Sequence, residues 1–232
     1  DKVVALLPMK ANSTRVKGKN FRDFRGKPLF RWILDSLLQV EEISKVVINT
    51  DARHILAENG LVETDRVMIR DRKPEICGDD VSMNLVLADD IANVASDLYL
   101  MTHTTNPLLS AITIQLAIGA FLDAYANGKA DSLFTVNKVQ ASFYRSDASP
   151  VNHDPNNLVP TQSLEPWFEE NSNLYIFSAG SFAKTNARIG LFPMMLESPG
   201  FESIDIDTPA DWDLALVAAR LLEEQGRSKS LV

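Results

Sequence analysis

A cluster of basic residues follows the first apolar run of the chain. Between Lys10 and Arg31 the sequence holds eight Lys or Arg residues and one acidic residue, Asp23. Four of these cations belong to a loop rich in small residues, namely Lys10, Arg15, Lys17 and Lys19. Small residues let backbone N–H groups approach a ligand while cations neutralise it, a combination that suits a polyphosphate. A solvated surface loop is the alternative, and neither G-x-x-x-x-G-K-[ST] nor G-x-G-x-x-G occurs here.

A pair of carboxylates lies near the other end of the chain, in the sequence SIDIDTP. If this stretch is a strand, Asp205 and Asp207 point to one side and the isoleucines to the other. Two carboxylates at the end of a strand can share Mg²⁺, which prefers oxygen ligands. Helix capping accounts for Thr208, Pro209 and Asp211 but leaves Asp205 unexplained. We therefore predict a Mg²⁺ site at the aspartate pair.

A third polar stretch, THTTNP, follows the apolar run LYLM. Its side chains His103, Thr104, Thr105 and Asn106 could hydrogen-bond the hydroxyls of a sugar or ribose, and capping of the next helix explains them equally well. No Ser/His/Asp set and no Cys/His pair is apparent. The single cysteine, Cys77, can form neither an intrachain disulfide nor a cysteine-based zinc site.

Apolar runs alternate with amphipathic stretches along most of the sequence, which predicts an α/β fold. The expected strands are 3–8, 45–50, 66–70, 97–102, 131–136, 173–177, 191–196 and 202–206. The expected helices are 28–39, 52–59, 82–94, 111–127 and 209–225. This order indicates three layers, a mostly parallel sheet with helices on both faces. Parallel sheets bind ligands at the carboxyl ends of their strands, where the polar stretches above begin.

The length of 232 residues suits one domain spanning 1–232. The alternation is interrupted at 140–170, where four prolines indicate a loop-rich excursion. The formal net charge of −8 argues against a nucleic-acid partner. No apolar run approaches the length of a membrane helix, and no secretion signal is visible, so we expect a cytoplasmic protein.

Several segments, in the same order along the chain, resemble the cytidylyltransferases that activate acidic 2-keto sugars. This family holds the CMP-N-acylneuraminate and CMP-KDO synthetases. The first loop shares Pro8, Ser13, Lys19 and Asn20 with the neuraminate pattern I-P-A-R-x-G-S-K-G-x-x-x-K-N, and Ser13-Thr14-Arg15 with the KDO pattern A-S-T-R. Other matching segments are Arg25–Leu29, Asn49–Asp51, Lys73–Ile76 and Asp205–Pro209. The matches extend from about residue 3 to residue 218.

The resemblance implies a nucleotidyltransferase (Rossmann-like) fold and a reaction. The anomeric hydroxyl of a 3-deoxy-2-keto sugar acid would attack the α-phosphate of CTP, giving a CMP-sugar and pyrophosphate with Mg²⁺ as cofactor. The nucleotide would contact Lys10, Ser13, Arg15, Lys19, Lys73 and Ser82. The acceptor would contact His103, Thr105, Asn106 and Asn171. Asp205 and Asp207 would hold the metal, and the catalytic residues would be Lys19, Arg15 and Asp207.

The acceptor half departs from the neuraminate pattern. His103 replaces a Gln, Leu109 an Arg, and Glu169 an Arg that often faces the acceptor. The identity of the sugar acid is therefore open, and Arg145 or Arg188 could bind its carboxylate. One alternative is a nucleotidyltransferase for another sugar or sugar phosphate. The other is a catalytically silent nucleotide-binding homologue.

The excursion at 140–170 has its own expectation from the resemblance. In the family this region packs against a second subunit. We therefore expect a homodimer with 140–170 as the dimer arm, and a monomeric lid is the alternative.

Overall fold

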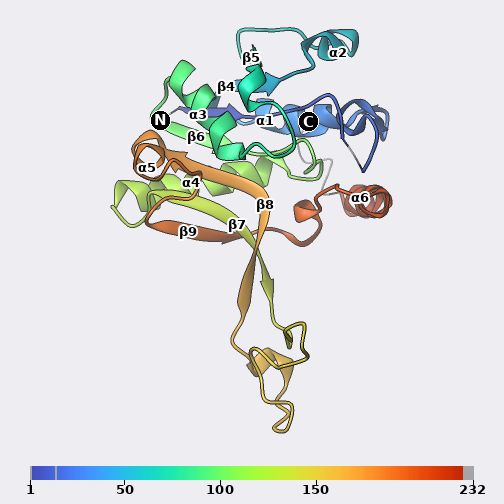
Figure 1. Cartoon of the computed structure of the whole chain (residues 1–232), viewed down its shortest axis with the longest axis vertical. Helices are drawn as coiled ribbons and strands as arrows, with labels where there is room; N and C mark the ends of the chain where they lie inside the picture. Colours follow the sequence, from blue (N-terminus) through green and yellow to red (C-terminus); the bar gives the residue numbers. More distant parts are fainter. Residues whose placement is uncertain (1, 14, 227–232) are drawn as a thin grey trace.

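A mixed sheet of seven strands forms the centre of the part of the chain that the computed structural model describes, residues 2–13 and 15–226 (Figure 1). Thr14, part of the first-loop resemblance, lies outside these residues, as do 1 and 227–232. The strand order is β5 (Val67–Asp71), β4 (Ile43–Thr50), β1 (Val3–Leu6), β6 (Leu98–Met101), β8 (Trp167–Ser178), β7 (Ser132–Val139) and β9 (Pro193–Glu197). Neighbours pair in parallel except at β8, which is antiparallel to β6 and β7. The predicted mostly parallel sheet is confirmed.

Helices cover both faces of the sheet because its central strands are apolar on both sides. All four residues of β1 are buried, which explains the continuous apolar run at the start of the sequence. Helices α1 (Leu29–Leu38) and α4 (Ala111–Ala126) pack on one face, and α3 (Met83–Asn93) and α5 (Ala179–Thr185) on the other. The short α2 (Arg53–Glu58) follows β4. None of the described helices is long and apolar enough to cross a lipid bilayer.

A separate apolar cluster joins the first loop to the C-terminal helix α6 (Pro209–Glu224). The first loop contains the 3₁₀ helix η1 (Lys19–Phe21) and leads into a short hairpin, β2 (Asp23–Phe24) and β3 (Lys27–Pro28). The buried members of the cluster are Val16, Phe24, Leu29, Ile206, Trp212 and Ala215. This packing brings residues 204–208 against the first loop, although the two segments lie near opposite ends of the sequence.

The predicted strand at 202–206 is wrong. Residues Gly200–Ser203 form the 3₁₀ helix η4, and 204–207 have no strand partner. The N–H of Ile206 instead donates to the carbonyl of Thr105 at 2.9 Å. Ile204 and Ile206 both pack against the cluster that holds Trp212. Their alternation reflects burial against one side of a loop, which a period of two in the sequence cannot distinguish from a strand.

Strands β7 and β8 continue beyond the sheet as a two-stranded ribbon, which ends in residues 140–166 (Figure 1). The ribbon and these residues together, called the arm, extend away from the body of the molecule. The ring of Phe143 stacks on Trp167 with the centroids 5.0 Å apart, and η3 (Thr161–Ser163) is the only helical turn described in this segment. Because β8 already begins at Trp167, the last residues of the predicted 140–170 excursion belong to a strand rather than to a loop.

The carboxyl ends of β1, β4, β5 and β6 meet at one edge of the sheet, because these strands run in the same direction. At this edge Met9 forms a parallel bridge with Thr50, and the N–H of Thr102 donates to the carbonyl of Leu6 at 3.3 Å. The first loop and the THTTNP stretch are thereby held next to each other.

Candidate active site

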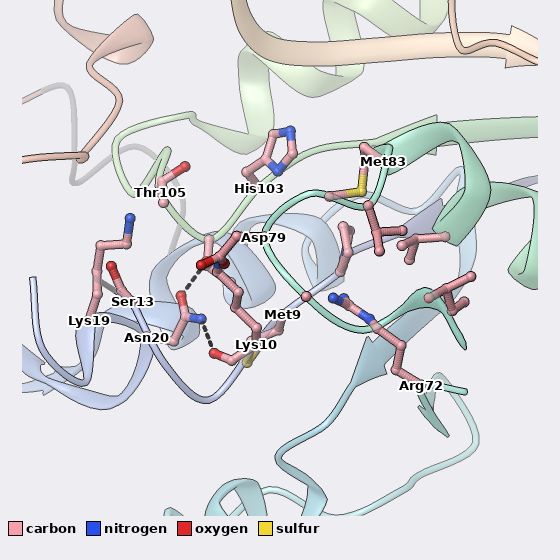
Figure 2. Close-up of a pocket in the computed structure, with 16 residues that line it drawn as sticks. Met9, Lys10, Ser13, Lys19, Asn20, Arg72, Asp79, Met83, His103 and Thr105 are labelled. Atoms are coloured by element: carbon pink, nitrogen blue, oxygen red, sulfur yellow. Dashed lines mark hydrogen bonds and ion pairs between the residues drawn. The ribbon is translucent and has the colours of Figure 1, made fainter. Parts of the chain in front are cut away.

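A cavity of about 200 Å³ opens at this edge of the sheet (Figure 2). The predicted site residues that line it are Lys10, Ser13, Lys19, His103 and Thr105. The other polar or charged lining residues are Asn20, Arg72, Asp79 and Thr104. Basic and hydroxyl side chains therefore converge on one hollow, as the binding of an anionic ligand requires.

Lys19 is the most buried cation of the site. Gly18 has a φ of 61°, a left-handed conformation that favours glycine and starts the 3₁₀ turn carrying Lys19. The ammonium donates to the carbonyl of Ile206 at 2.9 Å and lies 4.0 Å from Asp207. Burial lowers the pKa of Lys19, and attraction to Asp207 and Asp205 opposes that shift. The first loop and the aspartate pair thus form one site.

Asn20 holds the first loop in shape beneath the cavity. Its buried amide donates to the carbonyl of Lys10 at 2.7 Å and accepts from the Thr104 hydroxyl at 2.5 Å (Figure 2). The Lys10 side chain is exposed and pairs with Asp79 at 2.6 Å. Lys10 can therefore exchange this partner for an incoming anion at small cost, because exposed ion pairs contribute about 0–1 kcal/mol.

Three predicted nucleotide contacts lie outside the cavity lining. Arg15 is exposed, and its charge is close enough to help lower the pKa of Lys19. Lys73 pairs with Asp89 at 2.7 Å. Ser82 is the N-cap of α3 and accepts from a backbone N–H in its first turn. Their roles toward a nucleotide stay predictions.

The aspartate pair is brought together by the loop before α6 rather than by a strand. Burial, together with the nearby carboxylate of Asp207, raises the pKa of Asp205 to about 6. The Thr105 hydroxyl and the Lys19 ammonium act in the opposite direction. The Oδ1 atom of Asp205 is buried without a hydrogen-bond partner, whereas 54% of the Asp207 side chain is exposed.

This donor set fits a divalent cation. A buried carboxylate oxygen without a partner, next to a second carboxylate, is an arrangement that a bound cation would relieve. Capping nevertheless operates as the sequence indicated, since Thr208 and Asp211 form a reciprocal capping box and Pro209 opens α6. No cluster of three or more His, Cys, Asp and Glu residues suited to a metal occurs in the described part of the chain. Water and ligand oxygens would therefore complete such a site.

His103 is kept neutral at the rim of the cavity. Burial, together with the positive charges of Arg188 and Lys19, lowers the pKa of His103 to about 4. A neutral imidazole can donate to and accept from sugar hydroxyls but contributes no charge. Thr105 lies on the same loop and also lines the cavity.

The remaining predicted acceptor residues are engaged in structural hydrogen bonds. Asn106 is buried and donates to the carbonyl of Ser172 at 3.2 Å. The amide of Asn171 accepts from the Thr135 hydroxyl at 2.7 Å and donates to the Ser198 hydroxyl at 3.0 Å. Neither residue lines the cavity, so a direct contact between either residue and an acceptor stays a prediction.

The sequence reasoning missed Arg72, which lines the cavity. Its guanidinium donates from Nε to the side-chain oxygen of Asn49 at 2.8 Å. Asn49 in turn donates to the buried carboxylate of Asp90 at 2.8 Å, so a chain of hydrogen bonds from the core fixes the arginine. Arg72 comes directly after β5. Parallel sheets bind ligands at the carboxyl ends of their strands, and applying this rule to β5 as well would have identified Arg72 as a candidate.

Comparisons with known proteins match nearly the whole chain. The family model described as cytidylyltransferase matches residues 4–221. CMP-N,N'-diacetyllegionaminic acid synthase of Legionella pneumophila is 27% identical, with 96% of this chain and 98% of the relative covered. A 3-deoxy-manno-octulosonate cytidylyltransferase of Trichlorobacter lovleyi is 30% identical over 52% of this chain and 45% of its own length. A Helicobacter pylori protein named pseudaminic acid cytidylyltransferase and UDP-2,4-diacetamido-2,4,6-trideoxy-beta-L-altropyranose hydrolase is 23% identical over 88% and 40%.

Solved structures support the fold. The structure of CMP:2-keto-3-deoxy-manno-octonic acid synthetase complexed with CTP aligns with a TM-score of 0.66 at 16% identity, covering 97% of this chain and 100% of that one. 4-Diphosphocytidyl-2C-methyl-D-erythritol synthase from Anaerococcus prevotii aligns with a TM-score of 0.65 at 13% identity, covering 94% and 96%. The predicted nucleotidyltransferase fold is thus confirmed.

Proposed function

We propose that this chain, which belongs to the cytidylyltransferase family, couples CTP to a 3-deoxy-2-keto sugar acid. The anomeric hydroxyl oxygen would form a bond to the α-phosphorus of CTP. The bond from that phosphorus to the β-phosphate oxygen would break, pyrophosphate would leave, and the hydroxyl proton would pass to solvent or a nearby base. The observation that carries the proposal is the cavity in which Lys10, Ser13 and Lys19 converge beside the aspartate pair.

The cations of the first loop would bind the triphosphate. Phosphoryl-type transfer depends mainly on positioning and charge neutralisation. The partly buried ammonium of Lys19 would neutralise the leaving pyrophosphate, and Lys10 and Arg15 would hold the phosphates nearer to solvent. Ser82, at the start of α3, and Lys73, which pairs with Asp89 of that helix, would lie near the cytidine. The triphosphate would release Lys10 from Asp79.

Asp205 and Asp207 would hold Mg²⁺. Mg²⁺, when bound, would neutralise negative charge at the α-phosphate. Asp205 supplies the buried oxygen without a partner, and the exposed Asp207 can turn toward a ligand. The attraction between this pair and Lys19 orients the ammonium toward the same place.

The acceptor would lie on the side of His103 and Thr105, which line the same cavity. Asn106 and Asn171 would shape this side through the hydrogen bonds described above. The relatives are named for legionaminic, pseudaminic and octulosonic acids, all of them acidic sugars, which supports a sugar acid as the substrate class. A cytoplasmic location, where cells make CTP, is part of the same proposal.

The arm would make the protein a homodimer. Its residues Leu158 and Phe168 are exposed, Leu158 by 86%, and apolar side chains on an extended ribbon gain most from burial against a second copy. Light scattering tests this point. We expect a dimer for the natural protein and a monomer for Leu158→Asp combined with Phe168→Asp, and a natural protein that is monomeric at all concentrations would exclude the dimer.

Pyrophosphate release tests the activity. We expect release with CTP and Mg²⁺ and one of three sugar acids, namely N,N'-diacetyllegionaminic acid, pseudaminic acid and 3-deoxy-manno-octulosonate. The controls are each acid without CTP and CTP alone. Turnover with UTP but not CTP would favour a transferase for another sugar. CTP binding without release for any acid would favour a silent homologue.

A further inference from the structure

Arg188 is a half-buried arginine that forms no ion pair with any described residue. It follows α5, and none of the ion pairs of the described chain includes it. Its guanidinium contacts the sulfur of Met101, 3.3 Å from Nη1, and the face of Tyr175, 3.9 Å from the ring centroid. Neither group can satisfy the five N–H donors of a guanidinium. The charge is partly desolvated without a counter-ion.

The surroundings hold this guanidinium in one place. The ring of Tyr175 is buried, and its hydroxyl donates to Glu170 at 2.6 Å and lies 3.2 Å from the Ser172 hydroxyl, from which it can accept. The backbone N–H of Arg188 donates to the side chain of Asn84 at 3.3 Å. The aromatic ring covers the face of the guanidinium rather than its edge, and the N–H groups that do not face Met101 can donate two parallel hydrogen bonds to a planar ligand. The arginine is therefore preorganised before any ligand arrives.

Arg188 lies next to the active-site cavity. Met101 is the last residue of β6, at the carboxyl edge of the sheet, and pairs with Tyr175 on β8. Met83, the neighbour of Asn84 in the chain, lines the cavity together with His103 (Figure 2). The charge of Arg188 contributes to the lowered pKa of His103, and that of Lys19 does so as well. His103 thus lies within electrostatic range of both cations, and Lys19 is the one that lies 4.0 Å from Asp207.

We propose that Arg188 binds the carboxylate of the acceptor sugar acid. The inference rests on the proposed function, because it assumes an acidic acceptor. An arginine fork matches a carboxylate with two parallel hydrogen bonds. In a 2-keto sugar acid the carboxyl carbon is bonded directly to the anomeric carbon. Holding the carboxylate on the His103 side therefore orients the reacting hydroxyl while the triphosphate occupies the side of Lys10 and Lys19.

Arg145 is the other arginine that the sequence offered for this role. It lies in the arm, where its N–H donates to the carbonyl of Ser149 and its side chain reaches the carbonyl of Pro150 at 3.5 Å. Within one chain the arm extends away from the body of the molecule (Figure 1). Arg188 is therefore the candidate that a single chain places beside the site.

Steady-state kinetics of Arg188→Gln and Arg188→Lys test the assignment. The probe is whichever of the three sugar acids the natural protein uses, together with the analogue in which its carboxylate is an uncharged amide. The matched control is Arg220→Gln, which removes an exposed arginine from α6. CTP affinity and thermal unfolding are measured on every variant, so that a folding defect is recognised.

We expect Arg188→Gln to lower kcat/KM for the acid by about 10- to 150-fold, the range for hydrogen bonds between charged groups, with the KM for CTP unchanged. Arg188→Lys should retain part of the activity, and Arg220→Gln all of it. The natural protein should prefer the acid to the amide, and Arg188→Gln should lose that preference.

Three results would overturn the assignment. One is an unchanged kcat/KM for the acid in Arg188→Gln. Another is a natural protein that uses the acid and the amide equally well. This comparison tests whether the carboxylate is recognised, even if the Arg188 variants fold poorly. The third is a loss confined to CTP, which would place Arg188 at the nucleotide. In each case turnover by the natural protein would leave the proposed function standing, whereas no turnover with any acid would reject both.

Discussion

Replacing Lys19 separates a catalytic role from a structural one. In Lys19→Met the apolar stem remains, but the hydrogen bond to the Ile206 carbonyl and the attraction to Asp207 are lost. One hydrogen bond contributes about 0.5–1.5 kcal/mol net to stability. The attraction to Asp207 adds little, because that carboxylate is largely exposed. Removing a buried ammonium recovers part of that loss. We expect a net destabilisation of about 1 kcal/mol, which corresponds to a fall in Tm of about 2–4 °C.

The expected loss of turnover is much larger. A preorganised donor at a site of developing charge contributes about 10²–10³-fold to kcat. Pyrophosphate release at saturating CTP and sugar acid measures kcat, and thermal unfolding without nucleotide measures Tm. Lys17→Met is the matched control, because Lys17 is exposed in the same loop and does not line the cavity. It should leave both quantities nearly unchanged.

The opposite pattern would refute the reasoning. If Lys19→Met keeps nearly the natural kcat while Tm falls, Lys19 serves only to tie the first loop to the segment before α6. If Lys17→Met loses as much turnover as Lys19→Met, the net charge of the loop matters rather than the position of one ammonium.

Three further outcomes follow from the contacts. Asp207→Asn should raise the Mg²⁺ concentration for half-maximal turnover, with Asp213→Asn as an exposed control, and superimposable titrations would contradict the metal assignment. Burial raises the pKa of Asp90 to about 6, so its ionisation lowers the free energy of unfolding as pH rises from 4 to 6. Asp90→Asn should therefore gain about 2 kcal/mol in the free energy of unfolding relative to the natural protein between pH 4.5 and 7, measured by urea unfolding, and a pH-independent difference would contradict this. Asn20→Ala should lower the free energy of unfolding by about 1–3 kcal/mol in urea, because the hydrogen bonds to the Lys10 carbonyl and the Thr104 hydroxyl are lost. It should also raise the KM for CTP, because Lys10 is held less firmly. Unchanged stability would contradict the role of Asn20 in holding the first loop.

The fold was largely predictable because local patterns agree with it. A strand buried on both faces, such as β1, must be apolar throughout, and an N-terminal cap such as Thr208 with Asp211 depends on residues only three apart. Where the pattern was ambiguous, the prediction was wrong. The two isoleucines at 204 and 206 share a cluster contributed by distant residues, and nothing local distinguishes that from a strand.

The candidate site was partly predictable for the same reason. The cations of the first loop and the aspartate pair stand out by residue type and position, and the structure brings Lys19 within 4.0 Å of Asp207. Arg72 directly follows the carboxyl end of β5, which is a weaker signal than a cluster of cations. Its place in the cavity depends on Asn49 and the buried Asp90, on two other elements.

The sequence by itself determined the alternating elements, the edge of the sheet where ligands bind, and the types of side chain available there. The tertiary structure decided which of them face the cavity. It directed Lys10, Lys19 and His103 toward the cavity, engaged Asn171 in the framework, and placed Arg188 on the face of Tyr175 without an ion pair to any described residue. The reason is physical. Desolvation and hydrogen bonding between residues far apart in the chain set the charge, exposure and orientation of each side chain, and a linear pattern does not encode those contacts.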